Sequence, residues 1–277
     1  MRAGYHRWHT YRMRWCTISV RRFQRRLAAA PATSIIEAAV SRLGSRAVVT
    51  SSFGTQSAVL LHMVRQIAPR IPVVWIDTGY LPPETYQYAH RLKREFDLNL
   101  HTYQSHMSPA RMEALYGRLW EETDPAALER YHQIRKVEPL HRALRELSAT
   151  AWIAGVRRSQ TDYRRTLQVA QRQGRICKIH PLLEWSDEDV AAYFDEHDLP
   201  RHPLSAQGYA TVGDAHLSRP VDASTSTSNS TSVDAEATAT ADEETARATR
   251  FAGRAQECGI HTTTVGEYRI EIPDWSP

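Results

Sequence analysis

Residues 46–57 read Arg-Ala-Val-Val-Thr-Ser-Ser-Phe-Gly-Thr-Gln-Ser. The apolar segment 46–50 predicts a short buried strand, the small polar residues after it predict a loop, and residues 56–68 predict a helix. A helix that starts directly after such a loop directs backbone N–H groups and a partial positive charge toward it, which favours an anion site. The loop has neither the Gly-Lys-Ser/Thr of a P-loop nor the three-glycine spacing of a dinucleotide fingerprint. Taken alone, it could equally be an ordinary turn.

The alternation of short apolar strands with amphipathic helices continues along the chain. It predicts an α/β fold with a doubly wound, mainly parallel sheet. Strands are predicted over 71–76, 98–103 and 150–154, and helices over 34–43, 84–96, 136–147 and from Ser186, where Ser186-Asp187-Glu188-Asp189 forms a capping box.

Two further loops follow predicted strands, at 77–85 and 155–165. Ligands of open α/β sheets bind outside the carboxyl ends of the strands, so loops at successive strand ends strengthen the prediction of a site. The loop at 155–165 carries four arginines, whose planar guanidinium groups suit bidentate contacts with phosphate or sulfate. Two alternatives stay open: Asp77 and Glu84 could cap helices, and the arginines could form a solvated surface. The arginines are Arg157, Arg158, Arg164 and Arg165.

The two ends of the chain differ from its centre in composition. Residues 1–26 hold eight arginines and no acidic residue, so we expect a basic extension over 1–30 that is disordered. A targeting segment and a nucleic-acid arm are the alternatives. Residues 221–246 contain five serines, six threonines and six acids without Lys, Arg or an aromatic residue. This composition predicts a flexible linker over 221–248, between an α/β nucleotide-binding domain at 31–220 and a tail at 249–277.

The chain has three cysteines, too few for a secreted disulfide framework, which predicts a reducing, cytoplasmic location. No apolar run approaches about 18 residues, so no membrane span is expected. Cys258 lies in the tail beyond the linker, where a thiol can visit a site and leave it, and it is the candidate nucleophile. Cys177 lies in an apolar run typical of an inert buried cysteine, and Cys16 lies in the basic extension.

These motifs, in this order, resemble the phosphoadenylyl sulfate (PAPS) reductase family. The loop at 52–57 is similar to that family's modified pyrophosphatase-type loop, and the segments at 76–86, 135–140 and 155–164 resemble its later motifs. The sequence Glu257-Cys258-Gly259-Ile260-His261 is similar to its catalytic tail. The resemblance implies an adenine nucleotide alpha hydrolase-like fold. The substrate-binding residues that it implies are Ser51, Ser52, Phe53, Gly54, Thr55, Gln56, Ser57, Asp77, Thr78, Gly79, Lys136, Gly155, Arg157, Gln160, Arg164, Arg165 and His261, with Cys258 as the catalytic residue.

Members of this family that reduce adenylyl sulfate (APS) hold a four-iron cluster through two cysteine pairs. Those positions correspond here to Tyr131, His132, Asp214 and Leu217, none of which is a cysteine, so we expect no iron–sulfur cluster and no metal. The resemblance then implies the PAPS-using kind. The chain departs from the family pattern at Ala255, which stands where a lysine is usual, and in its long insert at 221–246.

The resemblance also implies a reaction. Cys258 is expected to attack the sulfate sulfur of PAPS and to carry an S-sulfonate while adenosine 3′,5′-bisphosphate leaves. Reduced thioredoxin, or glutaredoxin, would then release sulfite. No bound cofactor and no nucleic-acid partner are expected, and the resemblance is compatible with a homodimer. The alternatives are a cluster-free APS reductase, an ATP pyrophosphatase, and a non-enzymatic nucleotide-binding or redox-sensing protein.

Overall fold

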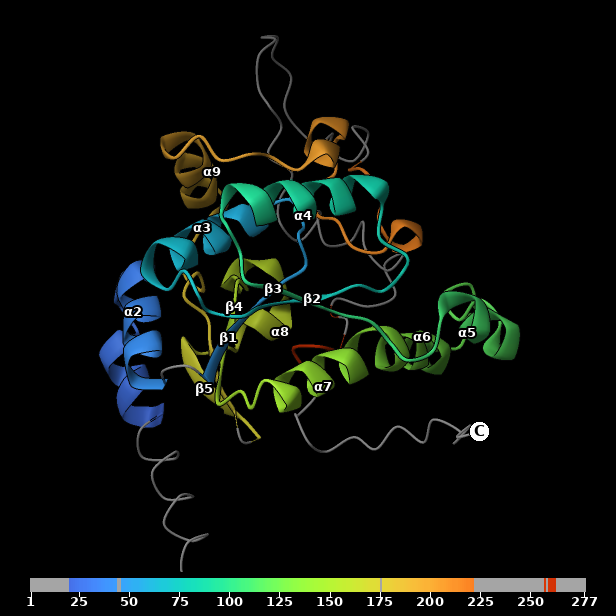
Figure 1. The fold of residues 1–277 in the computed structure, drawn as a ribbon, viewed down its shortest axis with the longest axis horizontal. Coiled ribbons are helices and arrows are strands. Elements are labelled where there is room, and N and C mark those ends of the chain that lie inside the picture. The colour runs from blue at the N-terminus through green and yellow to red at the C-terminus, as the bar shows by residue number, and fades with distance from the viewer. Residues whose placement is uncertain (1–19, 44–45, 175, 222–256, 258, 263–277) are drawn as a thin grey trace, which may run out of the picture.

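The computed structural model describes residues 20–43, 46–174, 176–221, 257 and 259–262. Within these residues, six strands form one sheet in the order β3-β2-β1-β4-β6-β5. Neighbouring strands run parallel except at one edge, where β5 lies antiparallel to β6. The predicted doubly wound, mainly parallel α/β fold is confirmed (Figure 1). The strands are β1 (Ala47–Ser51), β2 (Val73–Ile76), β3 (Leu100–Tyr103), β4 (Ala151–Ala154), β5 (Ala170–Gln173) and β6 (Ile176–Ile179).

Helices pack on both faces of this sheet (Figure 1). Proline occupies the first position of α4, α5 and α6, where its missing N–H is harmless because the first helical turn has no internal acceptor. The predicted capping box at Ser186 is present at the start of α9. No helix in the described part of the chain is long and apolar enough to cross a membrane. The helices are α2 (Ala32–Leu43), α3 (Ser57–Ile67), α4 (Pro83–Glu95), α5 (Pro109–Tyr116), α6 (Pro125–His132), α7 (Glu138–Glu146), α8 (Asp162–Arg165) and α9 (Asp187–Glu196).

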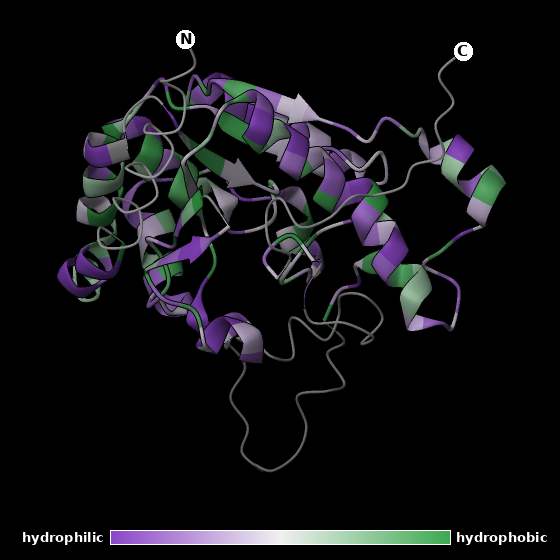
Figure 2. Cartoon of the chain, turned by 90° about the horizontal axis from the view of Figure 1, so that it is seen from below, coloured by the Kyte–Doolittle hydropathy of each residue, from purple (hydrophilic) through white to green (hydrophobic). Residues whose placement is uncertain are grey.

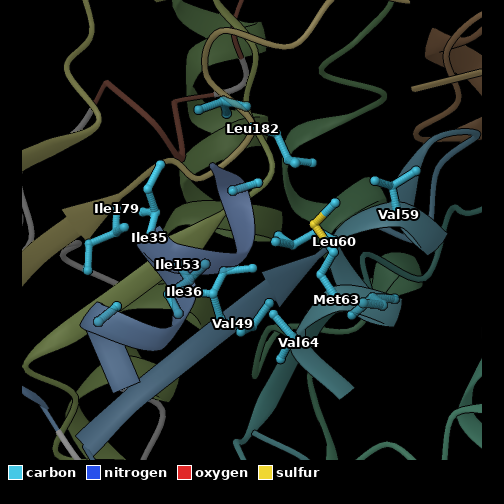
Figure 3. Packing of buried hydrophobic residues seen from close by; sticks show 14 of the residues in the cluster. Ile35, Ile36, Val49, Val59, Leu60, Met63, Val64, Ile153, Ile179 and Leu182 are labelled. Atoms are coloured by element: carbon cyan, nitrogen blue, oxygen red, sulfur yellow. The ribbon is translucent and has the colours of Figure 1, made fainter. Parts of the chain in front are cut away.

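Alternate residues of each strand face opposite layers of the fold. Val49, Ile153 and Ile179 belong to the larger hydrophobic cluster, which α2 and α3 cover on one face (Figure 3). Val48 and Trp152 point to the other face and pack with α7. Hydrophobic and hydrophilic residues alternate along the helices, as expected for helices that each bury one side (Figure 2). Each such buried side chain stabilises the fold by roughly 1.5–3 kcal/mol, so apolar burial holds both layers together.

The helix predicted over 136–147 differs from the structure. A π-helical segment, η2 (Gln133–Val137), joins α6 directly to α7. Pro139 lacks the N–H that the carbonyl of Arg135 would meet in a regular α-helix, and the wider turns of η2 accommodate this. All five residues of η2 are buried, so Arg135 and Lys136 have their charges inside the protein.

The predicted disorder of residues 1–30 is wrong for its last part. Residues 20–27 are helical and bury Val20, Phe23 and Leu27 against the larger cluster. The spacing of these three residues gives the helix one apolar side, and its arginines stay outside. Gln24 fixes it further, because its Oε1 accepts a hydrogen bond of 2.6 Å from the backbone N–H of Ala170 at the start of β5. Residues 1–19 lie outside the described part of the chain.

The sheet reverses its direction of growth beside β1. From β1 the chain adds β2 and β3 on one side, and then returns to place β4 on the other side. Ligands of open α/β sheets bind at such a switch point, outside the carboxyl ends of the strands. The loops that follow β1 and β4, at residues 52–56 and 155–161, therefore flank the expected site.

Candidate functional site

The loop after β1 carries backbone N–H groups that could bind an anion. Phe53 has φ of +51° and is fully buried against Trp75, with 5.0 Å between the ring centroids. Its N–H donates to Ser51 Oγ at 3.1 Å, and Thr55 Oγ1 donates to the carbonyl of Ala210 at 2.8 Å. The N–H groups of residues 54–56 donate no hydrogen bond to another described residue. These three donors precede α3, which is the arrangement that binds anions.

The second predicted loop is braced by Asp77, which is buried and does not cap a helix. Its Oδ1 accepts hydrogen bonds from the N–H of Gly79 at 2.8 Å and from the hydroxyl of Tyr86 at 2.6 Å. Its Oδ2 accepts one from Nε2 of Gln104 at 2.6 Å. Burial, and next the hydrogen bond to Asp77, raise the pKa of Tyr86 far above its usual value. Asp77 therefore sets the shape of the loop at the end of β2.

Gly79 is a position where only glycine fits. Its φ is +75°, and a Cβ would lie 2.7 Å from Cγ of Pro109. We expect Gly79→Ala to lower the free energy of unfolding by about 2–4 kcal/mol, from the left-handed backbone and from overpacking. Gly117 is the matched control, because its φ is +70° and a Cβ there would come no closer than 3.9 Å to Glu122 Oε1. Urea unfolding of Gly79→Ala and Gly117→Ala measures the difference, and equal losses would contradict the close approach.

Arg135 and Lys136, in the segment at 135–140, lie inside the protein. Lys136 Nζ lies 2.5 Å from Asp214 Oδ2, and both side chains are buried. Asp214 Oδ1 accepts a hydrogen bond of 2.5 Å from the hydroxyl of Thr78. Arg135 donates through Nε to the carbonyl of Thr78 at 2.7 Å and through Nη1 to that of Met107 at 2.5 Å. Lys136 and Thr78, both predicted to bind the substrate, therefore both contact Asp214.

Tyr131, Asp214 and Leu217, where the resemblance implies cluster cysteines in APS-reducing members, lie in one region. Tyr131 and Leu217 belong to one hydrophobic cluster, and Nζ of Lys136, which pairs with Asp214, lies 5.7 Å from the centre of the Tyr131 ring. His216 stacks on Trp120 with ring centroids 3.9 Å apart. Burial lowers the pKa of His216 to about 4, and burial together with the charge of Asp214 raises that of Tyr131. Within the described residues, no group of three His, Cys, Asp or Glu is arranged to hold a metal ion. Aromatic rings and one ion pair fill this region.

The loop after β4 is bonded to the loop after β1. Arg157 Nη2 donates to Gln56 Oε1 and to Asp187 Oδ1, both at 2.7 Å, and Gln56 Nε2 donates to the same Asp187 oxygen at 2.8 Å. Gln160 Oε1 accepts from the backbone N–H of Arg157 at 3.1 Å and from Nη1 of Arg164. Gln56, Arg157, Gln160 and Arg164, all predicted site residues, therefore form one continuous network.

The remaining residues of this loop lie differently. Arg158 is half-exposed and pairs with Glu184, and Arg165, which was predicted at the substrate, is exposed and pairs with Asp162. Gly155 lies close to α3, because a Cβ there would be 3.3 Å from Cδ2 of Leu60.

The tail reaches this network from the far end of the chain. Glu257 pairs with Arg164, with Oε1 2.6 Å from Nε. The carbonyl of His261 accepts hydrogen bonds from the hydroxyl of Tyr163 at 3.0 Å and from Nζ of Lys178 at 3.4 Å. The ring of His261 stacks on Trp152 with 5.6 Å between centroids. Cys258 itself lies outside the described residues.

Several residues of this site were not predicted from the sequence. Asp187 was assigned only to a capping box, although its carboxylate also holds Arg157. Lys178 is fully buried in β6 and lies 4.1 Å from the centre of the Trp152 ring. A lysine within an otherwise apolar strand was the signal that could have identified it, because buried lysines need a partner. Thr161 and Tyr163 carried no such signal.

The chain is similar in sequence and in structure to proteins that are already known. Residues 46–220 match the model of the phosphoadenosine phosphosulfate reductase domain. A phosphoadenosine 5′-phosphosulfate reductase of Synechococcus sp. is 50% identical over 235 residues, which are 85% of this chain and 94% of that protein. A protein of the same name from Synechocystis sp. is 49% identical over 86% of this chain and 88% of its own length. The phosphate complex of the PAPS reductase from Candida auris has a TM-score of 0.63 and 28% identity, covering 72% of this chain and 96% of that one.

Proposed function

The chain belongs to the phosphoadenosine phosphosulfate reductase family, and on that premise we propose that it reduces 3′-phosphoadenylyl sulfate to sulfite and adenosine 3′,5′-bisphosphate. It is then an oxidoreductase of sulfate assimilation that acts on a sulfur group. One observation of the structure supports this most strongly. The hydrogen-bonded network runs from Gln56, in the loop after β1, to Glu257, the neighbour of Cys258. The reactive tail and the anion loop thus belong to one site.

The reaction proceeds in two displacements on sulfur. The thiolate of Cys258 attacks the sulfate sulfur, the bond from that sulfur to the phosphate oxygen breaks, and adenosine 3′,5′-bisphosphate leaves with the electron pair. A thiolate of the reductant then attacks Sγ of Cys258, and sulfite leaves with the electron pair of the sulfur–sulfur bond. A second thiol of the reductant resolves the mixed disulfide and restores Cys258. Two thiols become one disulfide while sulfur passes from the sulfate to the sulfite oxidation state.

The residues around the switch point bind the nucleotide. The backbone N–H groups of residues 54–56, which bond to no other described residue, take a phosphate or the sulfate, and the dipole of α3 favours its charge. Arg157 and Lys136 lie near the loops but are paired with Asp187 and Asp214, so a bound anion would compete with these carboxylates for their positive charge. The loop at Asp77, Thr78 and Gly79 closes the other side of the site.

The reductant is a small dithiol protein, thioredoxin or glutaredoxin, because release of sulfite needs a second thiol to resolve the mixed disulfide. A thiol nucleophile also needs a reducing compartment, so the cytoplasm is the proposed location. A homodimer is the proposed assembly, by likeness to the family. No bound cofactor or iron–sulfur cluster takes part.

The test is sulfite release from PAPS and from APS with thioredoxin supplied. We expect kcat/KM to be roughly tenfold to a hundredfold higher for PAPS, because a 3′-phosphate adds charged hydrogen bonds that APS cannot make. Equal or better use of APS would assign the chain to cluster-free APS reduction. Failure to release sulfite from either nucleotide would overturn the proposed function and favour a non-enzymatic nucleotide-binding role.

A further inference from the structure

The contact between the tail and the domain is a buried, two-pronged ion pair. Glu257 Oε1 lies 2.6 Å from Arg164 Nε, and Oε2 lies 3.0 Å from Nη2. The hydroxyl of Thr161 donates to the same Oε1 at 2.8 Å. The side chains of Arg164 and Glu257 are only 6% and 8% exposed. Two parallel charged hydrogen bonds fix the orientation of the carboxylate as well as its position.

A second set of contacts holds the chain on the other side of Cys258. The carbonyl of His261 is bonded by Tyr163 and Lys178, and its ring lies over Trp152. Ile260 packs against the cluster between the sheet and α7. The described part of the tail therefore lies beside α8 and the sheet (Figure 1, red). The contacts fall one residue before Cys258 and two to three residues after it.

The arginines that follow β4 pair with different parts of the chain. Arg157 pairs with Asp187 and Arg158 with Glu184, both within the α/β domain, whereas Arg164 pairs with the tail. Arg164 also sits at the end of the Gln56–Arg157–Gln160 network, so a carboxylate bound there lies next to the loops of the nucleotide site.

We propose that the ion pair between Glu257 and Arg164 is the latch that seats the tail, and that Glu257 is the positioning residue for the Cys258 thiol. Arg164 then serves the tail, and not a phosphate of the substrate, while the tail is docked. The consequence for the reaction rests on the proposed function: attack on the sulfate needs the docked tail, whereas reduction of the S-sulfonate by a partner protein needs the tail released. Weakening the latch slows the first step and spares the second.

The latch itself is tested without substrate, in the full chain, by hydrogen exchange of the backbone amides in peptides that contain residues 257–262. Glu257→Gln keeps the shape of the side chain but removes its charge, and we expect exchange in these peptides to become at least roughly tenfold faster. Glu184→Gln is the matched control, since it breaks the neighbouring pair with Arg158, which holds no tail residue. Exchange in Glu257→Gln at the rate of the native chain would overturn the latch, whether or not the chain is a reductase.

The positioning role is tested in single turnover with PAPS and no reductant, by following the mass of one SO₃ group on the tryptic peptide 255–269. We expect Glu257→Gln to form the S-sulfonate roughly 10- to 100-fold more slowly, the range of a lost charge-assisted pair. Reduction of the preformed S-sulfonate by thioredoxin and the Kd for adenosine 3′,5′-bisphosphate should stay within about twofold of the native values, which a general loss of structure would not allow. S-sulfonate formation at the native rate in Glu257→Gln would overturn the positioning role. A native chain that forms no S-sulfonate would instead overturn the proposed function, and the exchange result would still decide the latch.

Discussion

Cys258→Ser is expected to abolish sulfite release, with a fall in rate of roughly a thousandfold or more. A serine hydroxyl ionises far less readily than a thiol, and it cannot form the sulfur–sulfur bond from which a reductant releases sulfite. The assay is sulfite release from PAPS with thioredoxin, combined with the mass of the tryptic peptide 255–269 after incubation with PAPS alone. The native chain should gain one SO₃ group on this peptide, and the variant none.

Cys177→Ala is the control for this prediction. Cys177 lies in β6 and is only 4% exposed, so the loss of its thiol should leave sulfite release close to the native rate. Sulfite release that survives in Cys258→Ser and disappears in Cys177→Ala would place the nucleophile in the sheet and contradict the reaction proposed above.

The parts of the fold that the sequence predicted are those that local pattern controls. β1, β2 and β4 are apolar runs buried between two layers of helices, and a loop of distinctive composition follows each of them. The capping box at Ser186 is likewise a contact between near neighbours. In contrast, β5 reads Ala-Gln-Arg-Gln and carries no strand pattern. It is a strand because β6 pairs with it and because Gln24 bonds its first N–H.

The sequence predicted several residues of the candidate site, but not which of them are bonded to one another. The four arginines of the third loop read as a dense positive charge, yet the structure pairs each of them with an acidic residue. The partner of Arg164 is 93 residues away in the chain, and a pairing at that distance depends on how the elements pack. Lys136, in η2, is a similar case, because its partner Asp214 lies 78 residues further on. The sequence shows where charged residues occur, whereas tertiary packing determines which of them form ion pairs.

Asp214→Ala is expected to lower the free energy of unfolding by about 3–5 kcal/mol, because it leaves the charge of Lys136 buried without its counter-charge. The ion pair between Lys136 and Asp214 measures 2.5 Å, and the side chains are 7% and 0% exposed. Urea unfolding gives the loss. Asp195→Ala is the control, since its partner Arg201 and Asp195 are 56% and 74% exposed, and such a pair contributes at most about 1 kcal/mol.

A double replacement shows why the pair matters. Lys136→Met with Asp214→Leu removes both charges and fills the space with apolar groups, so it should cost less than Asp214→Ala alone, although Thr78 loses its acceptor. This outcome would mean that each charge of the pair is needed to neutralise the other, and that the pair as a whole does not add to the stability of the fold. If Asp214→Ala instead unfolds as readily as Asp195→Ala and shows its defect in KM for PAPS, the ammonium of Lys136 serves the substrate, as the resemblance first implied. The stability and the KM of the same three variants therefore decide between a structural and a substrate-binding lysine.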